Sequence, residues 1–260
     1  MGSSCFQYCI NLTSINLDNV ITLGSSCFIN CSNLTSVSLP NATTLGTSCF
    51  QNCVNLTSVN LDSITTIGDN AFSYDTNLTT VTLNNSLSTL GAFCFSGCSN
   101  LTSINLDNIT TIGSSCFQNC TNLSSINIEN AATIYWYAFN NCGALTSVTL
   151  NPTLSSIPVC GFRNTGISSI EIPSTVTLIG SSAFYNTPLN TFTFYDTNTI
   201  TVFTNALPLT MSSIYYRGSP GKTASDLETE YLSRYNNENA LKPSANKTIY
   251  YVPYEDWHTE

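Results

Sequence analysis

The sequence predicts a repeat solenoid of the α/β class, in which short coils stack along one axis. Two observations predict it: one residue pattern returns at a fixed spacing, and each copy contains both a strand-like stretch and a glycine-led turn. Copies register on the position held by Leu12, Leu34, Leu56, Leu78, Leu101, Leu123, Leu145, Ile167, Leu189 and Met211. The spacing is 22 residues, with one step of 23. A fixed short period over so many copies is the signature of a solenoid.

Each coil begins with a stretch that should form a short strand. In the first complete copy, Ile15 and Leu17 alternate with polar Ser14, Asn16 and Asp18. A period of two marks a strand with one buried face. We therefore expect one strand per coil, and the strands of about ten coils should stack in parallel as a ribbon on one face.

The second half of each coil is led by a glycine and contains a phenylalanine. Glycine recurs as in Gly24 and Gly46, which indicates a turn or a close backbone approach. The Ser-Ser-Cys-Phe-x-x-Cys stretch that follows is long enough for only a turn or two of helix. We expect these helical turns, or irregular segments, opposite the ribbon, with the phenylalanines stacked between the two walls. These are Phe6, Phe28, Phe50, Phe72, Phe95, Phe117, Phe139, Phe162 and Phe184.

Composition excludes several classes of function. Only 8% of residues are charged, and the net charge is −9. Up to Tyr216 the chain has eight acidic residues and one base, Arg163. Nucleic-acid binding needs a basic stripe, so we expect no nucleic-acid partner. No apolar run approaches the ~20 residues that cross a bilayer, so we expect no membrane insertion. Because Met1 falls inside a coil, we expect residues 1–216 to be an N-terminally truncated solenoid.

The pattern L-x-x-I-x-L-x-x-V-x-x-I-G-x-x-A-F-x-x-C resembles the leucine-rich repeat of BspA-like and Treponema pallidum-type surface proteins. The resemblance extends from about Gly2 to Tyr216. The chain departs from it by placing cysteine before the phenylalanine and by the segment Tyr135-Trp136-Tyr137. The resemblance implies a horseshoe-like, right-handed solenoid with the strand ribbon on its concave face. It also implies a secreted or cell-surface location and a role in adhesion or protein binding.

Twelve cysteines invite a chemical interpretation, and ten of them form pairs spaced by four residues, such as Cys116 and Cys120. Such pairs could hold structural zinc or form disulfides. The other copies favour a different interpretation. Ala71 fills the first cysteine position in one copy and Asp75 the second, which suggests a small apolar slot followed by a small polar one. We expect buried, free thiols that fill the core, and no metal site or cofactor.

The outward-facing strand residues form neutral columns of Ser, Thr and Asn that could bind a partner or could simply be solvated. Concave solenoid faces are habitual binding surfaces. The aromatic segment that breaks the repeat is the second candidate, because exposed aromatics anchor interfaces, although the rings could instead repack locally. The candidate binding residues are Ser103, Asn105, Asp107, Asn60, Asp62, Asn127, Tyr135, Trp136 and Tyr137.

The repeat pattern stops after Tyr216. Ser225 to Glu228 reads as a helix start with a capping box, and an apolar face then continues to about Asn237. Residues 247–252 read as a strand. We expect residues 217–260 to be a C-terminal cap, with a helix at about 225–237 and a strand at about 247–252, that seals the open end of the stack.

Catalysis is not expected. The only histidine is His258, near the end of the chain, so no cysteine has a histidine within the repeats to activate it. The leading hypothesis is a non-catalytic adhesion module that binds a protein of a host or neighbouring cell on the concave face. The alternatives are a structural surface stalk or coat component, and carbohydrate binding through the exposed aromatics.

Overall fold

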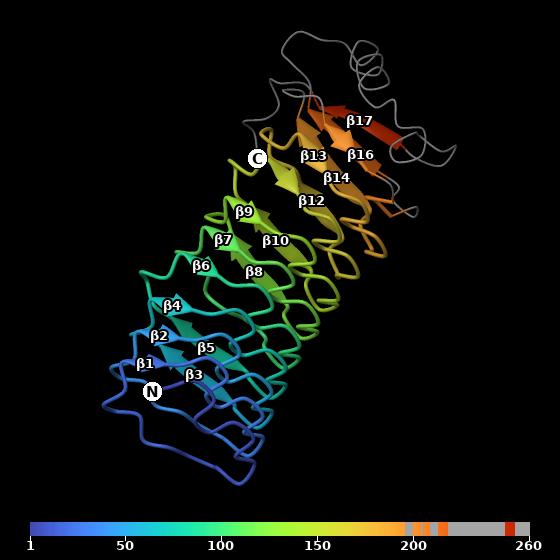
Figure 1. Ribbon diagram of the computed structural model, residues 1–260. Coiled ribbons are helices and arrows are strands. Elements are labelled where there is room, and N and C mark those ends of the chain that lie inside the picture. The colour runs from blue at the N-terminus through green and yellow to red at the C-terminus, as the bar shows by residue number, and fades with distance from the viewer. Residues whose placement is uncertain (196–199, 204, 209–212, 218–247, 253–260) are drawn as a thin grey trace.

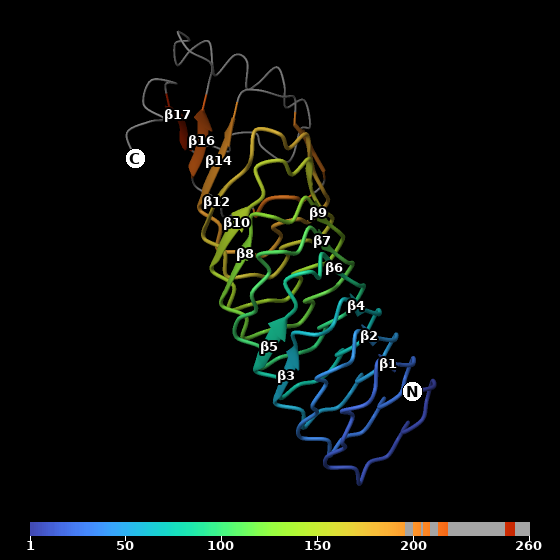
Figure 2. The same cartoon turned by 90° about the vertical axis from the view of Figure 1, so that its left-hand side faces the viewer.

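The computed structural model describes residues 1–195, 200–203, 205–208, 213–217 and 248–252 (Figure 1). The chain winds into an elongated stack of coils, with the N-terminus at one end (Figures 1 and 2). Its strands pair in parallel, and most of them pair with a strand one coil further along. The predicted solenoid is therefore confirmed.

The first ribbon contains the predicted strands. Its register follows the repeat, so that Ser58 pairs with Thr80 and Leu61 with Leu83. Burial alternates along each strand, as in the exposed-buried-exposed-buried pattern of residues 58–61. The strands are β3 (Ser58–Leu61), β5 (Thr80–Leu83), β8 (Ser125–Ile128), β10 (Ser147–Leu150), β12 (Ser169–Glu171), β14 (Thr191–Tyr195), β16 (Ser213–Arg217) and β17 (Thr248–Val252).

The first ribbon is interrupted rather than continuous. Its strands form three sheets, β3–β5, β8–β10 and β12–β14–β16–β17. The corresponding stretches at 14–17, 36–39 and 103–106 follow the same path without forming strands. The outward side of this ribbon is called the ribbon face below.

A second ribbon, which the sequence reasoning missed, runs along another side of the stack. Each strand is two residues long and ends just before the repeat glycine or the residue that replaces it. β-branched residues such as Thr66 and Ile67 favour this extended conformation. The strands are β1 (Thr22–Leu23), β2 (Thr44–Leu45), β4 (Thr66–Ile67), β6 (Thr89–Leu90), β7 (Thr111–Ile112), β9 (Thr133–Ile134), β11 (Ser156–Ile157), β13 (Leu178–Ile179) and β15 (Thr201–Val202).

The third side, called the turn wall, runs in each coil from the repeat glycine position to the second cysteine position, as in residues 24–31. The expected helical turns do not form there. Ser26 and Asn30 adopt positive φ, which breaks a right-handed helix. Alternate N–H groups donate to the next coil, as from Phe28 to the Cys49 carbonyl at 2.8 Å. No α-helix occurs among the described residues, so the α/β class is corrected to an all-β solenoid there.

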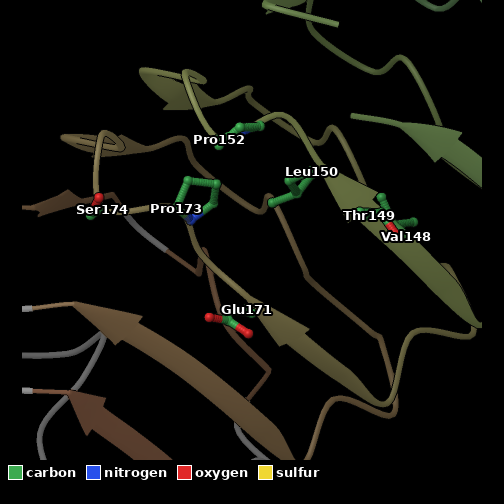
Figure 3. A pocket seen from close by; sticks show the side chains of 7 residues that line it. All are labelled: Val148, Thr149, Leu150, Pro152, Glu171, Pro173 and Ser174. Atoms are coloured by element: carbon green, nitrogen blue, oxygen red, sulfur yellow. The ribbon is translucent and has the colours of Figure 1, made fainter. Parts of the chain in front are cut away.

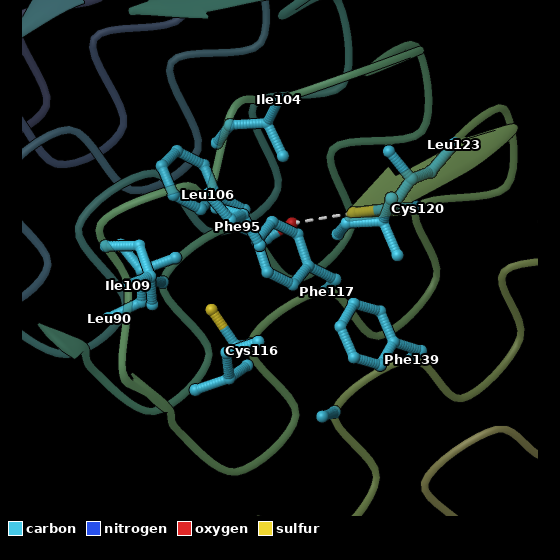
Figure 4. Close-up of a cluster of buried hydrophobic side chains, with 14 of the residues drawn as sticks. Leu90, Phe95, Ile104, Leu106, Ile109, Cys116, Phe117, Cys120, Leu123 and Phe139 are labelled. Atoms are coloured by element: carbon cyan, nitrogen blue, oxygen red, sulfur yellow. Dashed lines mark hydrogen bonds between the residues drawn. The ribbon is translucent and has the colours of Figure 1, made fainter. Parts of the chain in front are cut away.

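The core is a column of side chains between these three sides, and the phenylalanine ladder lies within it (Figure 4). Neighbouring rings from Phe6 to Phe184 stack with centroids 5.2–5.7 Å apart and planes within 10°. The rings from Phe28 onward are fully buried. The ladder predicted from the sequence is thus confirmed.

Most of the C-terminal segment lies outside the described residues, and so does the helix expected at 225–237. Within the described part, β17 pairs in parallel with β16, from Ser213 opposite Thr248 to Arg217 opposite Val252. The division of the chain at residue 217 into solenoid and cap stays a prediction.

Candidate binding surfaces

The polar columns of the ribbon face are exposed, but their asparagines also have a structural role. Asn60 Oδ1 accepts a hydrogen bond of 2.9 Å from the N–H of Asp62. Asn105 does the same for Asp107 at 2.8 Å, and Asn127 for Glu129 at 3.1 Å. Each of these bonds fixes the bend where the chain leaves the first ribbon, called the corner below. The three candidate residues Asn60, Asn105 and Asn127 therefore shape the coil, whatever else they bind.

The structure brings several of the predicted binding residues to one place. Asp62, Asn105 and Asp107 line a cleft of about 300 Å³ at the corners of three successive coils. Ser103 is exposed on the same coil, in one of the stretches that do not form a strand. Asn127 is exposed on the following coil and is not part of this lining.

This cleft has its origin in a corner with one additional residue. Three residues separate Leu83 from Leu87, whereas two separate Leu61 from Ile64. The additional residue makes the corner at Asn84 wider than its neighbours on either side. It also accounts for the single 23-residue step in the repeat. The 23-residue step was thus visible in the sequence, but the cleft that it produces was not predicted.

A larger cleft, of about 480 Å³, lies where the first ribbon is interrupted between β10 and β12 (Figure 3). Three residues again separate Leu150 from Leu154, and Ile172 from Val176. Here the connection from the turn wall to the next strand is one residue shorter, as between Thr165 and Ile167, and this restores the 22-residue spacing. The repeat length therefore hides both wide corners. The cleft is lined by Val148, Thr149, Leu150, Pro152, Glu171, Pro173 and Ser174.

Tyr135, Trp136 and Tyr137 lie together on the turn wall, away from the ribbon face. Their side chains are 50%, 60% and 38% exposed. All three residues are therefore exposed, and the Tyr137 side chain also contacts the thiol of Cys160. Tyr137 N–H donates to the Val159 carbonyl at 3.0 Å, which fixes this segment against the next coil.

The exposed surface around these rings continues over the next two coils. Val159 is 40% exposed and Tyr185 44% exposed. The guanidinium of Arg163 lies 5.4 Å from the centroid of the Tyr185 ring. The name aromatic surface is used below for Tyr135, Trp136, Tyr137, Val159, Arg163 and Tyr185.

The cysteines form part of the core. Ten of the twelve are buried, Cys9 is half-buried, Cys5 is exposed, and all are free thiols. In the second position the thiol donates to the phenylalanine carbonyl of the preceding coil, as from Cys120 to Phe95 at 3.2 Å (Figure 4). Where Thr165 takes this position, its hydroxyl donates to the Phe162 carbonyl at 2.9 Å. The interpretation of these positions as core slots is thus confirmed.

Burial also determines the chemistry of the thiols. It raises the pKa of Cys27 to about 11 and that of Cys142 to about 12. A thiol with so high a pKa is a poor nucleophile and a poor metal ligand at neutral pH. No group of three candidate metal ligands occurs in the described part of the chain. His258 lies outside that part. No described helix is long and apolar enough to cross a membrane.

Several solved structures resemble this chain, among them the following three. A leucine-rich repeat protein from Bacteroides ovatus is 27% identical with a TM-score of 0.60; the match covers 84% of this chain and 52% of that protein, so this chain spans about half its length. A leucine-rich cell surface protein from Faecalibacterium prausnitzii is 20% identical, with a TM-score of 0.46 over 92% and 80% of the two chains. The pneumococcal vaccine antigen PcpA is 14% identical, with a TM-score of 0.34 over 94% and 78%.

The search of curated proteins gave no match. The profile of the BspA type leucine rich repeat region matches residues 1–109 and 100–207, in six copies. This match covers well over half of the chain and the same coils that the structure stacks. The chain therefore belongs to the BspA-type leucine-rich repeat family.

Proposed function

We propose that this chain is a non-catalytic interaction module, secreted or at a cell surface, that binds a protein of a host or neighbouring cell. The observation that carries the proposal is the exposure of Tyr135, Trp136 and Tyr137, at positions where most other coils carry Gly-Ser-Ser or similar small residues. Large aromatic side chains that are exposed are typical of interface anchors. The family supports the same general role, because repeat proteins offer extended surfaces for binding.

In this proposal the aromatic surface provides the anchor, and the ribbon face adds a second, polar contact surface. Apart from charged residues such as Glu171, the ribbon face is uniform and neutral, so it contributes hydrogen bonds more than specificity. The aromatic surface differs from coil to coil and is therefore the more discriminating of the two.

The test replaces the anchor without disturbing the coil. Tyr135→Gly, Trp136→Ser and Tyr137→Ser together restore the residues that the preceding coil has at Gly113, Ser114 and Ser115. The unmodified chain is first screened against host-cell and extracellular-matrix proteins. The triple variant should bind any protein found in this way about tenfold or more weakly. Tyr74→Asn is the control, because it removes an exposed ring elsewhere and restores the residue of the preceding coil. Unchanged binding by the triple variant would contradict the anchor role.

Carbohydrate binding is a second candidate, favoured by the 60% exposure of Trp136. An exposed indole face can stack on a sugar ring. On a glycan array, the same triple variant should then lose its signal while protein binding stays unchanged.

A structural stalk or coat component is the third candidate, and the asparagine ladder favours it. Asn55, Asn77 and Asn100 each donate from Nδ2 to the asparagine of the preceding coil at 3.3–3.4 Å. Such a ladder stabilises a stack without recognising anything. Absence of any ligand, together with unchanged cell adhesion of the triple variant, would favour this role.

A further inference from the structure

We propose that the cleft between β10 and β12 is a docking site for a lysine or arginine side chain of the protein partner. This inference rests on the proposed role in protein binding and names one contact within it. The cleft, called the β10–β12 cleft below, measures about 480 Å³ and opens beside the ribbon face (Figure 3).

The cleft is built into the fold because both of its corners are held by hydrogen bonds. Asn151 is 7% exposed, and its Oδ1 accepts from the N–H and the hydroxyl of Thr153, each at 2.6 Å. In the next coil, Thr175 Oγ1 lies 2.8 Å from the carbonyl oxygens of both Pro152 and Leu154. Two wide corners are thus fixed to each other, and the space between them is preformed.

The cleft leaves apolar atoms uncovered that other coils bury. Val148 is half-buried, whereas Val59, Ile126 and Ile170 in the equivalent position are buried. Leu150 is 8% exposed, compared with 0% for Leu61 in the same position. The rings of Pro152 and Pro173 add to this apolar lining. A partner side chain that docks here therefore needs a long aliphatic stem.

Glu171 provides the only charge in this lining. It stands where other coils place Asn60, Asn105 or Asn127, whose side chains close the corner by accepting from the N–H two residues on. In this coil that residue is Pro173, which has no N–H. Glu171 therefore cannot close its corner in the way that Asn60, Asn105 and Asn127 close theirs.

The chemistry of the cleft selects a basic occupant. Lysine and arginine lay their methylene stems along apolar surface while the charged head stays at the wet rim. An apolar floor with a carboxylate at its side matches that shape. The acidic character of the chain, with eight acids and one base up to Tyr216, also attracts basic segments over longer distances.

The test uses capped pentapeptides Gly-Ser-X-Ser-Gly, where X is lysine, arginine, norleucine or glutamate, with backbone amide NMR of the whole chain as readout. We expect the lysine and arginine peptides to shift the amides of residues 148–150 and 171–174. They should bind about fivefold tighter than the norleucine peptide, which keeps the stem without the charge. The glutamate peptide should not bind.

Three variants make the test specific. Glu171→Gln should reduce lysine-peptide affinity to that of the norleucine peptide, and Ser174→Trp should remove binding by filling the cleft. Glu129→Gln, an exposed carboxylate at a corner outside the cleft, is the matched control and should leave affinity unchanged. All three replace exposed side chains, so the melting temperature should not change.

Several outcomes would overturn the proposal. Equal shifts with lysine and glutamate peptides, or shifts that map away from the cleft, would show that it is not a basic-residue site. An equal loss for Glu129→Gln and Glu171→Gln would show diffuse attraction to the acidic surface only. The proposed interaction role would survive these results, because it is tested separately with the aromatic surface.

Discussion

Asp75 Oδ1 accepts a hydrogen bond of 2.8 Å from the backbone N–H of Cys53, one coil earlier. Asp75 takes the second cysteine position of its coil and is completely buried, and its Oδ2 has no hydrogen-bond partner. Burial therefore raises the pKa of this carboxyl group well above its usual value. A single acidic residue thus stands in a column that elsewhere consists of thiols and hydroxyls.

This carboxyl group should make the stability of the chain depend on pH. Its pKa is raised in the folded state, so the folded state retains the proton where the unfolded state has lost it. Above about pH 4, the free energy of unfolding should fall by up to about 1.4 kcal/mol per pH unit. The decrease should end once the pH passes the pKa of the folded state. Urea denaturation between about pH 4 and 8 measures it.

Asp75→Asn should remove this dependence and stabilise the protein at neutral pH. The amide keeps the acceptor for Cys53 N–H and carries no charge to bury. Asp62→Asn, at an exposed carboxylate, is the control and should keep the slope of the unmodified chain. If Asp75→Asn lowers stability at pH 7, the buried carboxylate is stabilised by a partner and the predicted pH dependence is wrong.

The two cysteine positions should respond differently to alanine. Cys116→Ala places at its position the residue found at Ala71 and Ala138, so a cost below about 1.5 kcal/mol is expected. Cys120→Ala also removes the bond to the Phe95 carbonyl, so about 1 kcal/mol more should be lost. Thermal and urea denaturation compare the two variants. Equal costs would show that the thiol donor contributes nothing.

The thiols should be protected by burial rather than by oxidation. In the native protein, a thiol reagent should react readily with Cys5 and more slowly with Cys9. Under denaturing, non-reducing conditions, most of the twelve should react. Few reactive thiols after denaturation would indicate disulfides and would contradict the core-slot interpretation.

The repeat glycine should be needed where coils approach most closely. A Cβ atom on Gly46 would lie 2.5 Å from the backbone nitrogen of Ser25, so Gly46→Ala should cost about 1–3 kcal/mol. Gly143→Ala is the matched control, because its Cβ would meet nothing within 4 Å. Equal melting temperatures for the two variants would show that the coils can move apart without cost.

Truncating two phenylalanines that are two residues apart should cost very different amounts of stability. Phe95 is fully buried between the rings of Phe72 and Phe117, so Phe95→Ala should cost about 3–5 kcal/mol. Phe93 is 40% exposed, and Phe93→Ser should cost less than about 1 kcal/mol. Chemical denaturation of both variants tests whether Phe95 points into the core and Phe93 toward solvent.

Several features that the sequence predicted depend on local pattern alone. The alternation at Val59 and Leu61 indicated a strand with one buried face, and the structure has it in β3. The phenylalanine ladder followed from one residue type at one position of the repeat. The alanines that replace cysteine elsewhere identified the first cysteine position as a core slot. Each of these inferences needed only the period and the side-chain chemistry.

Other features could not be predicted because they depend on neighbouring coils. The turn wall was expected to contain helical turns, because the Ser-Ser-Cys-Phe-x-x-Cys stretch is long enough for a turn or two. Its N–H groups instead alternate between bonds within the coil and bonds to the next one, as at Ile29 and Phe28. Which carbonyl each N–H group bonds to depends on where the next coil lies. The corner bond of Asn105 to the Asp107 N–H was missed for a related reason, because its outward position suggested a binding role.

By itself, the sequence determined the repeat, the alternating stretch that each coil places along the first ribbon and the residues that fill the core. Only the tertiary structure decided which backbone groups pair between coils, where the first ribbon is interrupted and which aromatic rings stay exposed. The clefts at the wide corners belong to this second group. A cleft arises from the mismatch between successive coils, and that mismatch exists only once they are stacked.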